Sequence, residues 1–300
     1  MIPVTTIGGY LGAGKTTLVN HLLRHAGGRR LAVLVNEFGA LPIDADLIEA
    51  QDGDMISIAG GCICCSFGND LIGALRDLAA LDPAPKHILI EASGVAIPSG
   101  IAASVALMAE YELGAVVVLA DVETVQDQAQ DTYLGDTILR QLQDADLVLA
   151  TKVDLVDAVA RTRALAWLDS KARHSEVVPV ANGEVPIEVV LGPRERASDP
   201  RADPHADALF QSHVIEVPHP VDVDSLAERL RAGGLGLVRA KGFLRGLDGK
   251  CHLVQLVGKR VETRVFEGPV SRLALVCIGR VGAINETDLN AVFAFEPARG

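Results

Sequence analysis

The ten residues GGYLGAGKTT, at 8–17, constrain the fold of this chain more than any other stretch. Within them Gly9, four further residues and then Gly14, Lys15 and Thr16 form the pattern of a phosphate-binding loop. The apolar run VTTI precedes the loop, and a segment with leucines at helical spacing follows it and ends on a glycine pair. A strand, a glycine turn and a helix in this order are the setting that the pattern requires, so we expect a P-loop nucleotide-binding fold.

Each residue type in this loop has a chemical use at a phosphate. Glycines let backbone N–H groups converge on phosphate oxygens, and the helix N-terminus adds positive potential. Lys15 is expected to reach the β- and γ-phosphates, and Thr16 to offer its hydroxyl to Mg²⁺. An alternative, a glycine-rich turn that merely packs a helix on a strand, has no use for a lysine and a threonine here. The predicted phosphate contacts are Gly9, Gly12, Ala13, Gly14, Lys15, Thr16 and Thr17.

The stretch Thr151-Lys152-Val153-Asp154 ends a later apolar strand and favours guanine as the base. A carboxylate there can accept two hydrogen bonds from a guanine edge, and adenine lacks that pair of donors. We therefore expect GTP, with Thr151, Lys152 and Asp154 at the base. Asn182 and Gly183 follow the next apolar run, VVPV, and are predicted to form a second base-facing loop. The alternative is an ordinary polar loop after a strand.

Acidic residues elsewhere supply the other half of the predicted magnesium site. The buried run HILIE ends in Glu91, and a backbone N–H of Gly94 can sense the γ-phosphate. The alternative for Glu91 is a helix-capping carboxylate. The segment NEFGALPID resembles a switch segment, in which Glu37 or Asp44 orients the attacking water. In this part of the chain the predicted metal ligands are Thr16, Glu37 and Glu91, and Lys15 and Mg²⁺ stabilise the developing charge.

Three cysteines, Cys62, Cys64 and Cys65, lie within four consecutive positions after the apolar run MISI. As thiolates they can converge on one soft or borderline cation and leave a fourth position open. Three alternatives are buried small hydrophobes, a redox pair of Cys62 with Cys65, and a disulfide. Cys251 and Cys277 alternate within later strands and are expected to be core residues.

Length and composition describe an ordinary globular protein. The chain has 300 residues, of which 49% are apolar, and a formal net charge of −12. This charge argues against nucleic acid and anionic membrane as partners. No run approaches the ~20 apolar residues of a membrane span, and the N-terminus lacks the features of a signal peptide. We therefore expect a cytoplasmic protein.

Apolar runs rich in Val, Ile and Leu recur along the first two thirds, separated by segments long enough for crossover helices. They predict an α/β domain over 1–192, a P-loop NTPase fold whose mostly parallel sheet is covered by helices on both faces. A Pro, Asp and Arg-rich linker is predicted over 193–211. A small α+β domain with an antiparallel sheet is predicted over 212–300, with a hairpin turn at Asp248-Gly249 and a final helix from about 285–288.

In their order, GGYLGAGKTT, NEFGALPID, GGCICCS, ILIEASGVAIPS and TKVDL resemble the CobW-type GTPases, relatives of the GTPases that insert nickel into urease and hydrogenase. RAKGFLR, at 239–245, resembles the signature of that family's C-terminal domain. The resemblance covers nearly the whole chain. It implies a slow GTPase that binds a transition metal at Cys62, Cys64 and Cys65, zinc first and cobalt or iron as alternatives. The metal is then transferred to a client metalloprotein or a cofactor pathway, and a homodimer is one possible assembly.

One departure concerns histidine. Many members carry a histidine-rich run near the linker, whereas His205, His213 and His219 are scattered here and are expected to be exposed or packing residues. If the protein is a GTPase of this kind, we expect GTP and Mg²⁺ to order the 37–44 segment and thereby rearrange the adjacent cysteine loop. Two rivals stay open: a nucleotide-switched, redox-sensing regulatory module without metal transfer, and a small-molecule kinase, which TKVDL disfavours.

Overall fold

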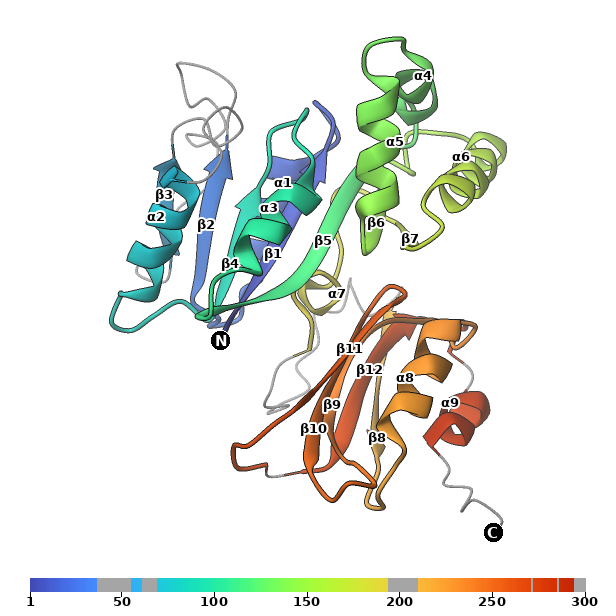
Figure 1. Ribbon diagram of the computed structural model, residues 1–300. Coiled ribbons are helices and arrows are strands. Elements are labelled where there is room, and N and C mark those ends of the chain that lie inside the picture. The colour runs from blue at the N-terminus through green and yellow to red at the C-terminus, as the bar shows by residue number, and fades with distance from the viewer. Residues whose placement is uncertain (37–54, 61–68, 194–209, 271, 285, 294–300) are drawn as a thin grey trace. The chain divides into compact units, whose positions relative to one another are not determined.

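A computed structural model describes residues 1–36, 55–60, 69–193, 210–270, 272–284 and 286–293. The chain divides into two compact units, Met1–Leu191 and Gly192–Gly300. Figure 1 shows the helices and strands of both units. None of the described helices is long and apolar enough to cross a membrane.

Within its described residues the first unit contains a seven-stranded sheet with the order β3-β2-β4-β1-β5-β6-β7. Every pairing in it is parallel. All five residues of β4 are buried, as the apolar run HILIE predicts for a strand covered on both faces. The strands are β1 (Ile2–Gly9), β2 (Leu31–Asn36), β3 (Met55–Gly60), β4 (His87–Glu91), β5 (Tyr111–Asp121), β6 (Leu147–Thr151) and β7 (Glu176–Pro179).

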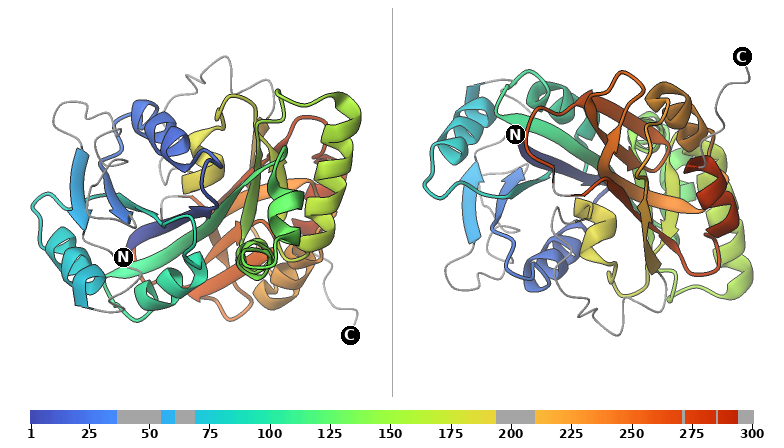
Figure 2. Two further views of the ribbon diagram at one scale, coloured as in Figure 1. Left: turned by 90° about the horizontal axis from the view of Figure 1, so that it is seen from above. Right: turned by 90° about the horizontal axis from the view of Figure 1, so that it is seen from below.

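Helices cover both faces of this sheet. Helices α1 and α7 lie on one face, and α2, α3 and α5 lie on the other (Figure 2, left). Apolar residues of α2 and α3 pack on β1, β2 and β4 in one cluster, and those of α5 and α6 pack on β5 and β6 in a second. The helices are α1 (Lys15–Arg24), α2 (Asn69–Ala79), α3 (Pro98–Val105), α4 (Val125–Gln130), α5 (Gly135–Asp144), α6 (Ala158–Lys171) and α7 (Ile187–Leu191).

The second unit is a five-stranded antiparallel sheet with the order β11-β10-β9-β12-β8, counted over its described residues. Two helices pack on one face and share one apolar core with it (Figure 1). Asp222 caps the first of them by accepting a hydrogen bond from the Ser225 N–H at 3.2 Å. The elements are β8 (Phe210–Glu216), α8 (Val223–Ala232), β9 (Leu237–Arg245), β10 (Cys251–Val257), β11 (Arg260–Val265), β12 (Ala274–Arg280) and α9 (Glu286–Phe293).

The predicted fold class is confirmed in both units. The predicted hairpin turn joins β9 to β10, with Gly249 at a φ of 79°. Two boundaries differ from the expectation. Strand β8 begins at Phe210, inside the predicted linker, because Phe210 pairs with Arg280 of β12. Helix α1 ends at Arg24, before the glycine pair, because His25 already leaves the helical conformation.

Candidate nucleotide-binding site

The loop after β1 and the start of α1 form the centre of the candidate site. Gly9 has a φ of 127°, and a Cβ there would lie 2.4 Å from the Leu119 backbone oxygen. Gly14 is the N-cap of α1, with a φ of 98° and no side-chain cap. Both positions need glycine, the first for close approach to β5 and the second for its left-handed backbone. No side chain caps the start of α1, so this helix N-terminus has the form of an anion-binding site.

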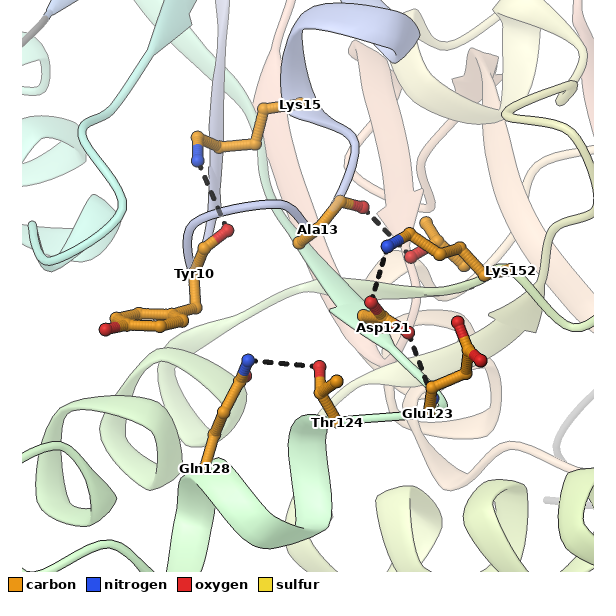
Figure 3. Close-up of polar contacts among 9 residues, drawn as sticks. Tyr10, Ala13, Lys15, Asp121, Glu123, Thr124, Gln128 and Lys152 are labelled. Carbon is orange, nitrogen blue, oxygen red and sulfur yellow. Dashed lines mark hydrogen bonds and ion pairs between the residues drawn. The ribbon is translucent and has the colours of Figure 1, made fainter. Parts of the chain in front are cut away.

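Lys15, the first residue of α1, lies folded back over the loop. Its side chain is largely buried, and its Nζ donates to the Gly9 backbone oxygen at 3.0 Å. The same Nζ donates to the Tyr10 backbone oxygen at 3.4 Å (Figure 3). These carbonyls hold the ammonium at the loop, where the phosphates of a nucleotide are expected. Phosphate oxygens are stronger acceptors for an ammonium than neutral carbonyls are.

Thr16 and Glu91 meet across the end of the sheet. The Thr16 hydroxyl donates to Glu91 Oε1 at 3.2 Å, and Glu91 is only 2% exposed at the end of β4. The next helix, α3, begins at Pro98 with Ile97 as its N-cap, so the alternative of Glu91 as a cap of that helix is wrong. A hydroxyl and a carboxylate are oxygen ligands of the kind that Mg²⁺ takes. The chemistry of this pair therefore fits the predicted magnesium ion.

The loop after β4 lies against the phosphate-binding loop. A Cβ on Gly94 would be 2.9 Å from the Leu11 backbone nitrogen, so the two loops touch at backbone level. Gln141 of α5, which is 1% exposed, anchors this loop. Its Nε2 donates to the Gly94 oxygen at 3.2 Å and to the Ala96 oxygen at 2.7 Å. Gln141 is a residue that the sequence motifs did not single out.

The predicted base-reading loop also adjoins the phosphate-binding loop. The Thr151 hydroxyl donates to the Ala13 backbone oxygen at 2.9 Å. Lys152 adopts a left-handed backbone with a φ of 61°. Asp154 is exposed, and its Oδ1 accepts the Asn182 backbone N–H at 3.2 Å.

The second predicted base-facing loop meets α1. Asn182 has a φ of 53° and Gly183 one of 72°. A Cβ on Gly183 would lie 2.9 Å from Thr17 Cγ2. The loops after β6 and β7 thus gather beside the phosphate-binding loop, at the carboxyl edge of the sheet where nucleotides bind in such folds.

Asp121, at the end of β5, is a second residue that the motifs missed. Its Oδ2 lies 2.6 Å from Lys152 Nζ, and its Oδ1 accepts the Glu123 backbone N–H at 2.9 Å (Figure 3). A signal for it exists, since the apolar run AVVVLAD ends in an acid just as HILIE does.

Several predicted residues lie outside the described part of the chain. They are Glu37, Asp44, Cys62, Cys64, Cys65 and His205. Strand β2 ends just before Glu37 and strand β3 just before the cysteines, with Asn36 and Gly60 as register partners at their carboxyl ends. The described residues hold no group of three or more His, Cys, Asp or Glu side chains that could bind a metal.

The second unit contains two described cysteines, Cys251 in β10 and Cys277 in β12. Cys277 is fully buried, and burial raises the pKa of its thiol to about 12. Burial also raises the pKa of the half-buried Cys251, against a smaller opposing effect of Arg245. Both remain thiols at neutral pH, which suits packing and disfavours thiolate ligation. His219 is a packing residue, with Nε2 3.0 Å from the Phe293 backbone oxygen.

Comparison with known proteins gives two family matches and a set of relatives. Residues 3–179 match the CobW/HypB/UreG nucleotide-binding domain, and residues 210–294 match the cobalamin synthesis protein cobW C-terminal domain. A protein named zinc chaperone CobW from Pseudomonas aeruginosa is 32% identical, over 87% of this chain and 82% of its own. The protein of the same name from Sinorhizobium is 29% identical over 87% and 86%. The zinc chaperone YjiA of Escherichia coli is 31% identical over 83% of each.

Proposed function

The chain belongs to the CobW/HypB/UreG family and is a GTPase, and from this premise we propose that GTP controls its handling of a transition metal. The metal, zinc foremost, is cargo held at Cys62, Cys64 and Cys65 and delivered to a client metalloprotein. One observation carries the proposal. Relatives that align over more than four fifths of both chains are named zinc chaperones, and this chain has three clustered cysteines able to bind such an ion.

The arrangement of the described site supports the nucleotide part of this proposal. On GTP binding, Lys15 exchanges its two backbone acceptors for phosphate oxygens, and the N-terminus of α1 lies beside the same phosphates. Thr16 and Glu91 would hold Mg²⁺, which when bound neutralises phosphate charge. Asp154 accepts hydrogen bonds from the guanine edge, and Asn182 keeps its carboxylate oriented.

The order of the strands supports coupling between nucleotide and metal. Strands β2 and β3 are neighbours in the sheet, and both end at the edge where β1 and β4 place Lys15 and Glu91. The switch segment follows β2, and the cysteines follow β3. We propose that Glu37 or Asp44 orients the attacking water, and that contacts of the switch segment with GTP set the metal affinity of the cysteines.

A titration of the reduced protein with Co²⁺ tests the proposal, with and without Mg²⁺ and a non-hydrolysable GTP analogue. We expect thiolate-to-cobalt charge-transfer absorption that appears at lower Co²⁺ when the analogue is present. By linkage, the metal must also tighten the analogue by the same factor. The absorption is expected to disappear in Cys62→Ser, Cys64→Ser and Cys65→Ser variants.

Cys251→Ser is the matched control, because this cysteine is half-buried in the second unit and lies outside the motif. It should leave the titration unchanged. Absence of thiolate absorption under every nucleotide condition would contradict the metal site. Thiolate absorption that does not respond to the GTP analogue would support the metal site but contradict its coupling to the nucleotide.

A further inference from the structure

In the loop predicted to read the guanine base, a lysine lies close in sequence to the aspartate that would bind guanine. Lys152 stands two residues before Asp154, and its left-handed backbone belongs to the turn that presents Asp154. A lysine has a flexible stem and a compact ammonium, which can pair with a carboxylate this near in the chain. Such a pair would occupy the acceptor oxygens that a guanine edge needs.

The structure holds the ammonium of Lys152 elsewhere. Its Nζ is 2.6 Å from Asp121 Oδ2, which is the distance of a strong charge-assisted hydrogen bond. The Asp121 side chain is 8% exposed and that of Lys152 is 35% exposed, so solvent screens this pair less than it would a surface pair. The other oxygen of Asp121 accepts the Glu123 N–H, which fixes the orientation of the carboxylate.

The pairing of β5 with β6 places Asp121 beside the loop that contains Lys152 and Asp154. Asp121 and Thr151 are register partners at the ends of β5 and β6. The Val122 N–H also donates to the Thr151 oxygen at 3.2 Å. The acid is therefore part of the rigid edge of the sheet and not of the loop that it restrains.

We propose that Asp121 is a positioning residue for guanine recognition. It holds the Lys152 ammonium away from Asp154, so that the Asp154 carboxylate stays available to the N–H donors of the base. This inference rests on the proposed reading of guanine by Asp154.

The test compares the dissociation constants of GDP and IDP, because hypoxanthine lacks the exocyclic amino group of guanine. Wild-type protein is expected to favour GDP by about tenfold, the value of one unmet hydrogen bond to a charged group. Asp121→Asn frees Lys152 and should reduce the ratio to about twofold. Adding Lys152→Met to Asp121→Asn removes the competing ammonium and should restore most of the ratio. Glu123→Gln, which removes an exposed charge two residues away, is the matched control and should keep the wild-type ratio.

A double variant whose ratio stays as low as that of Asp121→Asn would overturn the proposal, because the aspartate would then act without Lys152. An Asp121→Asn ratio equal to that of Glu123→Gln would overturn it as well. Should Asp121→Asn not fold, Asp121→Ser carries the test, because it also removes the carboxylate that pairs with Lys152 and should give the same low ratio. A ratio that stays at the wild-type value would contradict the proposal. If wild-type protein showed no preference for GDP over IDP, the proposed recognition of guanine by Asp154 would be contradicted instead.

Discussion

The Thr151 hydroxyl donates a hydrogen bond of 2.9 Å to the backbone oxygen of Ala13, which lies 138 residues earlier in the chain. This bond joins the loop assigned to the base with the loop assigned to the phosphates. Thr151→Val keeps the shape and removes the donor, so a buried carbonyl loses its partner. We expect GDP affinity to fall about three- to tenfold, measured by titration calorimetry. Thr151→Ser keeps the hydroxyl and should lie within about twofold of wild type, and equal losses in both variants would contradict this role.

Two glycines of the phosphate-binding loop are expected to differ when each is replaced by alanine. A Cβ on Gly9 would meet the Leu119 backbone oxygen at 2.4 Å, whereas one on Gly12 has nothing within 4 Å. Gly9→Ala should therefore lower the free energy of unfolding by more than about 2 kcal/mol. Gly12→Ala carries only the left-handed strain of its φ of 77°, about 1 kcal/mol. Urea denaturation of the nucleotide-free proteins measures both, and equal losses would contradict the packing argument.

Replacement of Glu91 tests the magnesium site. Glu91→Gln removes the charge of a nearly fully buried carboxylate next to Thr16. Wild-type protein should bind GTP more tightly with Mg²⁺ than with EDTA. The variant should lose this difference and hydrolyse GTP at least about tenfold more slowly. Glu184→Gln, at an exposed position, is the control. An undiminished response of the Glu91 variant to Mg²⁺ would exclude this carboxylate as a ligand.

Substitution of Asp154 should change the choice of base. Xanthine carries a carbonyl where guanine carries its exocyclic amino group, so Asn at this position can donate where Asp accepts. We expect Asp154→Asn to lose affinity for GDP and to gain it for XDP, with a reversal of about tenfold or more. Competition binding with both nucleotides measures the reversal. A variant that weakens both nucleotides equally would show that Asp154 does not read the base.

Stability at alkaline pH should depend on Tyr111. Burial, with a smaller effect of Glu110, raises the pKa of this phenol from 10.0 to about 12. The native state therefore keeps the phenolic proton more tightly than the unfolded chain. The associated stabilisation is complete below pH 10 and is lost as the pH rises from 10 to 12.

The matched variant is Tyr111→Phe, which also removes a hydrogen bond from the hydroxyl to the Leu75 backbone oxygen. It should be less stable than wild type by about 1 kcal/mol at pH 8. Between pH 8 and pH 12 the free energy of unfolding of wild type should fall by about 2 kcal/mol relative to that of the variant, so that the variant becomes the more stable protein. Denaturant unfolding across pH 8–12 measures it, and a constant difference would contradict the shifted pKa.

Much of the architecture is readable from the chain because parallel strands bury both faces. Runs such as HILIE then become continuous apolar segments, and the structure has a strand at each of them. The phosphate-binding loop is readable because glycine, lysine and threonine are needed at fixed spacing within one turn. Local chemistry of this kind does not depend on the rest of the fold.

Other features depend on segments that are distant in sequence. Gln141 is an ordinary helical glutamine until α5 is packed against the loop at Gly94, 47 residues earlier. Asp121 becomes a partner of Lys152 only because β5 and β6 are neighbours in the sheet. Strand β8 starts within a stretch that reads as linker, because pairing with β12 supplies its hydrogen bonds. Sequence spacing alone contains none of these pairings.

The buried Gln141 amide donates two hydrogen bonds, to Gly94 and Ala96, and these bonds couple the position of the loop after β4 to that of helix α5. A shift of the Gly94 backbone toward a terminal phosphate would have one of two results. Either both hydrogen bonds from the buried Gln141 break, or helix α5 moves together with the loop. The first outcome is costly, because a buried amide would lose its acceptors. Under the proposed function, loss of the γ-phosphate would then displace helix α5 together with this loop.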